Sequence, residues 1–199
     1  MAINFQYNKT SLQALDKQLK VRKKALPTLK NKESALRSEV KRAKDDAIRL
    51  DEELNKAMSG LDSMYRLWDE FDTSLISIEN VELSSKKIAG VLTPVLENIH
   101  FQIAPFNIFS HPVWFADGIA VLKNLAETAI KREVYISKMR ALDYARRKTT
   151  QKVNLYEKVQ IPGFQDAMRK IKRFLDDEEN LSKSAQKIVK TKHSQEVTS

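Results

Sequence analysis

Side chains that could carry out chemistry are few and scattered in this 199-residue chain. Its three histidines, His100, His111 and His193, lack the i, i+4 spacing that places two imidazoles on one helix face to hold a metal ion. The chain has no cysteine, which excludes thiol catalysis, zinc–thiolate sites and disulfides. We therefore predict no metal site and expect the histidines to be ordinary surface or core residues.

Nucleotide phosphates are usually held by backbone amides in loops with closely spaced glycines. The glycines of this chain stand far apart, at Gly60, Gly90, Gly118 and Gly163. The acidic run Asp176–Glu179 has no histidine or converging partner in the sequence, so we interpret it as a solvated helix face. We expect no bound nucleotide, no cofactor and no catalytic residue, and predict that the chain is not an enzyme.

The composition favours long helices in a soluble protein. The chain is 42% hydrophobic and 31% charged with a net charge of +9, and it has only four glycines and five prolines. So little glycine and proline is unusual for a sandwich, a barrel or a many-turned α/β fold. No segment has the run of about 18 to 20 apolar residues that a membrane span needs, and no signal peptide is visible. We expect one architectural unit in the cytoplasm.

The strongest pattern is a stripe of apolar residues at alternating steps of three and four. This spacing is the 3.5-residue repeat of a left-handed coiled coil. Charge interrupts the stripe only at Arg22 and Glu33, which either fix the register at a cost in stability or are simply tolerated. The seam consists of Leu12, Leu15, Leu19, Leu26, Leu29, Leu36, Val40, Leu50, Leu54, Leu61 and Trp68, with Ala43, Ala47, Ala57, Met64 and Phe71 in the same phase.

Pro27 lies inside this stripe. A proline in a helix interior typically costs about 3 kcal/mol, because it removes a hydrogen bond and its ring meets a backbone carbonyl. The phase of the stripe is the same at Leu26 and Leu29, which a loop would rarely preserve. We therefore expect a kinked, continuous helix at Pro27, with a break between two helices as the alternative.

The pattern changes after the N-terminal stripe, where residues 74–112 contain β-branched residues and three prolines. This composition predicts a small head with short strands. We expect Ile88–Leu92 to pair with Ile99–Ile103 as a hairpin that packs on the helices. Either core packing or a partner surface would account for the aromatic residues that follow: Phe106, Phe109, Trp114 and Phe115.

A second apolar stripe begins near Trp114, with a phase slip near Leu142 and an interruption at Pro162-Gly163. Two long stripes that flank a head must fold back on each other to be buried. We therefore predict a mostly α fold: a long, antiparallel two-helix coiled-coil hairpin with a small head containing a short β-hairpin. The expected divisions are an N-terminal shaft helix (11–72), the head (73–113), a C-terminal shaft helix (114–192) and a frayed tail (193–199).

The antiparallel arrangement also suggests a register. If Phe71 faces Phe115, Pro162 lies beside Leu26 and Pro27. The same register leaves the residues from Asp177 onward with little partner, so the C-terminal helix should project beyond the N-terminal one.

Basic side chains concentrate in residues 17–49 and 131–158, and acidic ones in residues 51–82. A basic helical surface could follow nucleic-acid phosphates, but few aromatic residues are interleaved for base stacking. A membrane-bending helical dimer would need basic residues on one concave side, which the pattern does not indicate. A free-standing basic coiled-coil protein that binds nucleic acid is the alternative function.

Several short segments occur in an order that resembles one known family. They are Asn8–Thr10, Leu15–Leu19, Leu29–Leu36, Ile88–Pro94, Lys152–Glu157 followed by Ile161-Pro162, and Ile188–Lys192. The most specific is the pattern V-N-x-x-E-x-x-x-I-P that begins at Val153. Together these segments resemble the D subunit of the V-type and A-type (V/A) rotary ATPases, which is the shaft of the central stalk.

The resemblance implies a non-catalytic rotor that transmits torque between the A/B catalytic hexamer and the membrane rotor ring. ATP hydrolysis or synthesis would be coupled to proton or sodium transport. The implied partners are the A and B subunits around the two terminal segments, the F subunit at the side of the shaft, and a ring-capping subunit of the C or d type at the head. The protein would be cytoplasmic and peripheral to the membrane, without nucleic acid as a partner.

The same resemblance gives two sets of candidate site residues. Basic residues toward the hexamer end are expected to meet acidic loops of the A or B subunits: Arg22, Lys23, Lys24, Lys190 and Lys192. A second set either shapes a bend in the shaft or only packs the helices: Pro27, Val153, Asn154, Glu157, Ile161 and Pro162.

Overall fold

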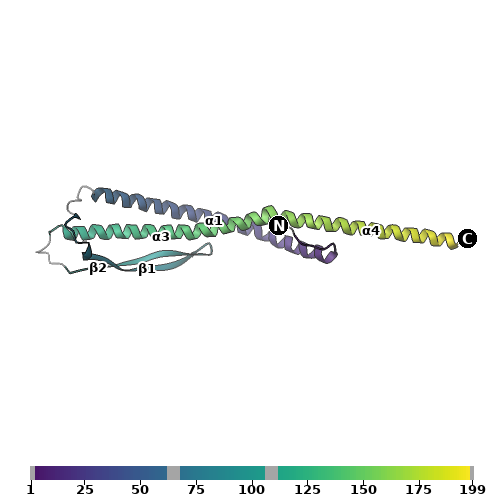
Figure 1. The fold of residues 1–199 in the computed structure, drawn as a ribbon, viewed down its shortest axis with the longest axis horizontal. Helices are drawn as coiled ribbons and strands as arrows, with labels where there is room; N and C mark the ends of the chain where they lie inside the picture. Colours follow the sequence, from purple (N-terminus) through teal and green to yellow (C-terminus); the bar gives the residue numbers. More distant parts are fainter. Residues whose placement is uncertain (1–2, 62–67, 106–111, 198–199) are drawn as a thin grey trace. The chain divides into compact units, whose positions relative to one another are not determined.

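A computed structural model describes residues 3–61, 68–105 and 112–197 of the chain (Figure 1). In chain order the elements are α1 (Lys9–Leu61), the 3₁₀ turn η2 (Thr73–Leu75), β1 (Ile76–Ile88), β2 (Val91–Ile103), α3 (Phe115–Asn154), the π-helical segment η3 (Leu155–Gln160) and α4 (Ile161–Val197). The predicted fold class, mostly α with a small β-hairpin, is confirmed. The chain forms two compact units: a terminal unit, residues 1–31 and 149–199, and a central unit, residues 32–148.

Helix α1 begins with a side-chain cap. The Oδ1 atom of Asn8 accepts a hydrogen bond from the backbone N–H of Ser11 at 2.7 Å, and Ser11 Oγ accepts one from the N–H of Gln6 at 3.2 Å. Such a cap satisfies one of the free amides of the first helical turn. The helix then continues through Pro27 without a break. Met64, the seam residue beyond its end, lies outside the described residues.

In the terminal unit, α1 packs antiparallel against α4. Leu15 and Leu19 of α1 form one buried cluster with Phe164, Ala167 and Ile171 of α4. The segment before α1 closes this cluster through Ile3 and Phe5, and Tyr7 reaches Phe174 with 5.0 Å between ring centroids. From Asp176 to His193 every side chain of α4 is exposed, and the helix continues past the start of α1 (Figure 1).

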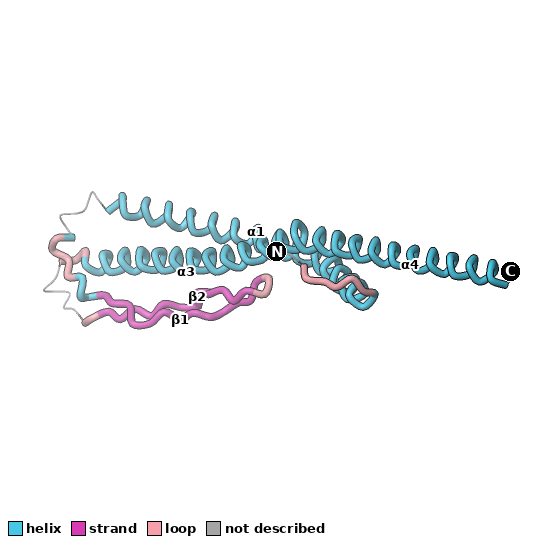
Figure 2. The backbone as a smooth tube through the Cα atoms, turned by 45° about the vertical axis from the view of Figure 1, so that its right-hand side comes forward, coloured by secondary structure: helices cyan, strands magenta, loops and turns pink. Residues whose placement is uncertain are grey.

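In the central unit, α1 and α3 lie side by side with the β-hairpin along them (Figures 1 and 2). Leu36 and Leu142 are both fully buried and share a cluster with Ala43. Ile88 at the hairpin's turn packs against the same cluster. Further along α1, Asp51 forms an ion pair with Arg132 of α3 at 2.6 Å, so the two helices run antiparallel.

The base of the hairpin and the start of α3 meet in an aromatic cluster. The rings of Phe71 and Phe115 are 5.1 Å apart between centroids, which confirms that these residues face each other. Trp114 lies 5.6 Å from Phe71, and Trp68 lies 5.4 Å from Trp114. Trp114 and Phe115 are therefore part of a packed core. The predictions for Phe106 and Phe109 fall outside the described residues.

The strands differ from the expected hairpin. Pairing runs from Ile76 opposite Ile103 to Ile88 opposite Val91, so the prediction that Ile88–Leu92 pairs with Ile99–Ile103 is wrong. Ala89 and Gly90 form a two-residue turn with φ angles of 48° and 81°, a conformation that matches the twist of tight hairpins. Pro94 is tolerated opposite Ser85 because each strand of a two-stranded sheet is an edge.

Candidate interaction site in the terminal unit

The main helix irregularity is the π-helical segment η3, directly before Pro162. Proline has no N–H, and its ring clashes with the carbonyl four residues earlier in a regular α-helix. In the structure the N–H of Ile161 donates to the carbonyl oxygen of Tyr156, the i to i−5 spacing of a π-turn. Pro162 therefore changes the hydrogen-bond spacing of the turn before it, and the helix continues.

One expectation for this helix is corrected. The helix is not interrupted at Pro162-Gly163, because α4 begins at Ile161 and continues through both residues. Near Leu142, where the apolar stripe changes phase, α3 stays α-helical and Leu142 is fully buried, so the change of phase does not end the helix. The wider turn of η3 lies further along the chain.

Arg22 crosses from α1 to this segment. Its Nε donates to Oε1 of Gln160 at 2.6 Å, and its guanidinium carbon lies 4.8 Å from the ring centroid of Phe164 and 5.8 Å from that of Tyr156. Stacking on aromatic faces suits the planar guanidinium and its weak hydration. The charged position in the seam is thus used for contact between the helices.

Lys30 makes the second polar contact across the helices, with 2.6 Å between its Nζ and Oε1 of Glu157. Together with the Arg22–Gln160 bond it brackets Pro27, which places Pro27 opposite η3. The expected register put Pro27 beside Pro162 itself, so the two prolines disturb nearly the same level of the unit.

Of the candidate bend residues, some have side chains packed between the helices and others have side chains exposed to solvent. Val153 is buried and Ile161 is half-buried, whereas Asn154 and Pro162 are exposed. Glu157 is held by Lys30. The structure thus gathers Pro27 and the C-terminal members of this set at one level; a bend there stays a prediction.

The candidate hexamer-facing residues are not brought together. Lys23 and Lys24 are exposed on α1 near η3, and Arg22 is half-buried against Gln160. Lys190 and Lys192 lie on the exposed end of α4, beyond the part that packs on α1. Their role as contacts stays a prediction.

A groove that the sequence did not indicate lies between α1 and the C-terminal helices of this unit. Its volume is about 460 Å³, and its lining residues are Val21, Lys24, Ala25, Thr28, Leu29, Lys152 and Tyr156. The available signal was the pair of short side chains at Ala25 and Thr28, next to the seam positions. A groove depends on what faces those residues, and the sequence does not give that directly.

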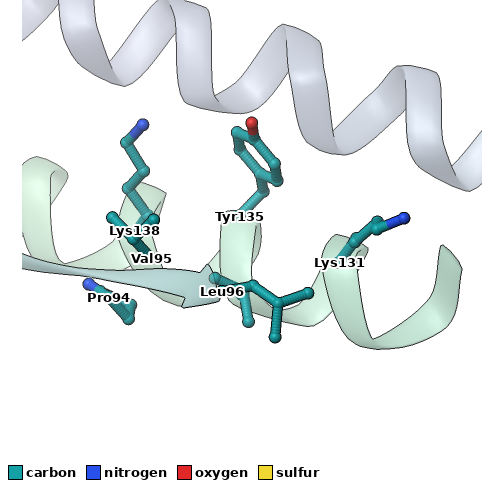
Figure 3. A pocket seen from close by; sticks show the side chains of 7 residues that line it. Pro94, Val95, Leu96, Lys131, Tyr135 and Lys138 are labelled. Atoms are coloured by element: carbon teal, nitrogen blue, oxygen red, sulfur yellow. The ribbon is translucent and has the colours of Figure 1, made fainter. Parts of the chain in front are cut away.

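A second hollow, of about 240 Å³, lies in the central unit between β2 and α3 (Figure 3). Pro94, Val95 and Leu96 of β2 lie across from Tyr135 and Lys138 of α3. The ammonium of Lys138 is 5.3 Å from the Tyr135 ring centroid, so its charge is already partly satisfied within the hollow.

Two carboxyl groups of the described residues have a pKa that departs from the usual value. The pKa of Asp143 lies below its usual value, chiefly because Arg146 donates a hydrogen bond to it and also because Arg147 does so, each at 2.7 Å. The pKa of Glu179 is also lowered, chiefly through its hydrogen bond with Lys183. Both carboxylates are therefore ionised at neutral pH and act within surface ion pairs.

In the described part of the chain, no three histidine, aspartate or glutamate side chains converge as metal ligands. The same residues include no helix with enough consecutive apolar side chains to cross a bilayer.

These features define a class: a mostly α-helical chain whose long helices pack antiparallel within each unit, with a two-stranded β-hairpin in the central unit. The family model for the D subunit of ATP synthase matches residues 11–191. The chain is 28% identical to the D subunit of the V-type ATP synthase from Borreliella burgdorferi over 92% of each chain, and 30% identical to that from Chlamydia abortus over 76% of each. The protein of the same name from Chlamydia muridarum is 26% identical over 96% of this chain and 97% of its own. The chain belongs to the family of ATP synthase D subunits, which confirms the resemblance seen in its short segments.

Proposed function

We propose that this chain is the central-stalk rotor subunit of a V/A-type ATPase or ATP synthase. It transmits torque between an A/B catalytic hexamer and the membrane rotor ring, and so couples ATP hydrolysis or synthesis to proton or sodium transport. The observation that carries the proposal is the family match over residues 11–191. It is supported by the antiparallel helix packing within each unit, because paired helices resist twisting better than loops.

In such a rotor, rotation is coupled to ATP chemistry because the contact energy between the shaft and each A–B pair changes with the orientation of the shaft. A shaft with unlike faces favours an open nucleotide site in one A–B pair and a closed site in another, and this difference links distant sites. The polar contacts Arg22–Gln160 and Lys30–Glu157 support this role, since they oppose sliding of α1 along its partner. We assign the bend that makes the shaft eccentric to Pro27 and the level of η3.

Four exposed lysines are proposed to meet acidic residues of the A or B subunits: Lys23, Lys24, Lys190 and Lys192. Long-range attraction to acidic loops would speed assembly. Arg22, next to Lys23 and Lys24 on α1, belongs to the same proposed set. Its side chain also binds Gln160 on the facing segment.

The remaining partners follow from the same proposal. The F subunit binds the side of the shaft, and a ring-capping subunit of the C or d type binds the head, residues 73–113. The membrane is met only through the complex, on its cytoplasmic side. The chain itself binds no nucleotide and catalyses no step.

ATP turnover tests this function. The purified chain alone should hydrolyse no ATP, and its addition to a reconstituted A–B hexamer should stimulate turnover. Hydrolysis by the chain alone would refute its non-catalytic role. Salt-dependent binding of duplex DNA without any binding to the hexamer would favour the nucleic-acid alternative instead.

A further inference from the structure

The groove in the terminal unit has an apolar floor that nothing in the described part of the unit covers. It has a volume of about 460 Å³, and Val21 at its edge is 64% exposed. The hollow exists because Ala25 and Thr28 present short side chains where α1 lies opposite Tyr156. An exposed apolar surface of this kind is a common feature of protein interaction sites.

The rim of the groove carries positive charge that lacks a carboxylate partner. Lys24 and Lys152 both line it, and neither forms an ion pair with a carboxylate in the described residues. Lys152 makes only a distant contact with the Tyr156 ring, 6.0 Å from its centroid.

Lysines on α1 near the groove differ in their partners. Lys20 pairs with Asp16 at 2.7 Å and Lys30 pairs with Glu157 at 2.6 Å, whereas Lys17 and Lys23, like Lys24, form no ion pair with a carboxylate of the described residues. What sets Lys24 and Lys152 apart is their place beside the uncovered apolar floor, and the two features together describe the chemistry of an occupant. It carries an apolar side chain with negative charge on either side of it.

We propose that the groove receives an acidic segment of the A or B subunit that presents one apolar side chain between carboxylates. The apolar side chain enters the hollow over Ala25 and Thr28, and the carboxylates pair with Lys24 and Lys152. A phosphate backbone would meet the lysines but leave the apolar floor uncovered. The inference rests on the proposed function, because the partner belongs to the same complex.

The test measures binding of the full-length chain to a reconstituted A–B hexamer at fixed ionic strength, with circular dichroism to verify helix content. Lys24→Glu combined with Lys152→Glu should weaken binding at least about tenfold, since two attractive contacts become repulsive. Ala25→Leu fills the hollow without changing charge and should also weaken binding, by about threefold or more.

Two control variants separate the groove from general charge. Lys17→Glu combined with Lys158→Glu makes the same change in net charge outside the groove and should weaken binding less than about threefold. Lys24→Arg combined with Lys152→Arg keeps both charges and should bind like the unchanged chain.

The outcomes distinguish this inference from the function on which it rests. If the unchanged chain binds and the groove variants bind no worse than the Lys17→Glu, Lys158→Glu control, the groove assignment is overturned while the rotor function stands. If Ala25→Leu alone has no effect, insertion of an apolar side chain is refuted. If the unchanged chain does not bind the hexamer, the proposed function fails and the groove assignment fails with it.

Discussion

At the scale of single residues, the two charged seam positions have different roles. Arg22 bonds across to Gln160 and stacks on Phe164, which supports a role in fixing the register. Glu33 instead pairs with Arg37 on its own helix at 2.8 Å, with 17% of its side chain exposed. The two charged seam positions thus differ in the contacts described here: Arg22 reaches the facing helix, and Glu33 forms an ion pair within α1.

Leu36 and Leu142 provide the clearest test of the packed seam. Each is fully buried in one cluster of the central unit, so Leu36→Ala or Leu142→Ala should lower the free energy of unfolding by about 2–5 kcal/mol. Leu181→Ala is the matched control, because Leu181 is 73% exposed and its loss should change little. Urea unfolding followed by circular dichroism measures both, and equal effects would contradict the packing described.

Asp143 should make stability depend on pH. Its pKa is lowered in the folded chain, chiefly by the hydrogen bond from Arg146, so its contribution is present above the unfolded pKa of about 3.9 and is lost as pH falls through the folded pKa. Asp143→Asn should cost less than about 1 kcal/mol at pH 7, since the pair is near the surface.

The difference between Asp143→Asn and the unchanged chain should stay constant from pH 7 to about pH 5 and shrink below about pH 4. Urea unfolding of both proteins across this pH range shows whether the difference in unfolding free energy shrinks or widens in acid. A difference that widens in acid would show that the carboxylate is not stabilised by Arg146 and Arg147.

At the scale of elements, the backbone hydrogen bond that closes η3 spans five residues, one more than in an α-helix, and this wider turn accommodates Pro162. A variant that lacks Val159 and carries Pro162→Ala should form a regular α-helix there and keep Phe164 turned toward α1. Its melting temperature should be at least that of the unchanged chain.

A matched deletion in α3 tests whether the Val159 deletion is tolerated because the helix faces stay aligned on either side of η3. Removing Glu133 from the regular part of α3 rotates the flanking turns by about 100° relative to each other, and should separate the aromatic cluster from the cluster around Leu142. That deletion should lower the melting temperature sharply. If both deletions are equally harmful, η3 is not an adjustable turn.

The sequence predicted the elements whose burial follows a strict repeat. Along α1 the leucines of the seam are buried or half-buried from Leu12 to Leu61, because the 3.5-residue spacing keeps them on one face. The hairpin was harder, since a two-stranded sheet leaves Ser84–Lys87 largely polar and hides the alternation that marks a strand. The π-segment and the groove depend on how the facing helix is aligned, which a repeat along one helix does not contain.

At the scale of the whole molecule, the family and the contacts within each unit give different kinds of information about the protein. Family membership defines the class of machine, and the polar contacts at Arg22 and Lys30 hold helices of the terminal unit in one alignment. The hairpin and the aromatic cluster build the head side of the central unit. The proposed transmission of force between partner subunits depends on these contacts.

Rotation of this chain inside the A–B hexamer can be observed in single molecules. The chain contains no cysteine, so Lys87→Cys at an exposed position of β1 gives a unique attachment point for a bead. With the hexamer fixed to a surface, we expect the bead to turn in one direction when ATP is added and to stop when ATP is removed. If a hexamer that contains the chain hydrolyses ATP while the bead stays still, the chain is not a rotor.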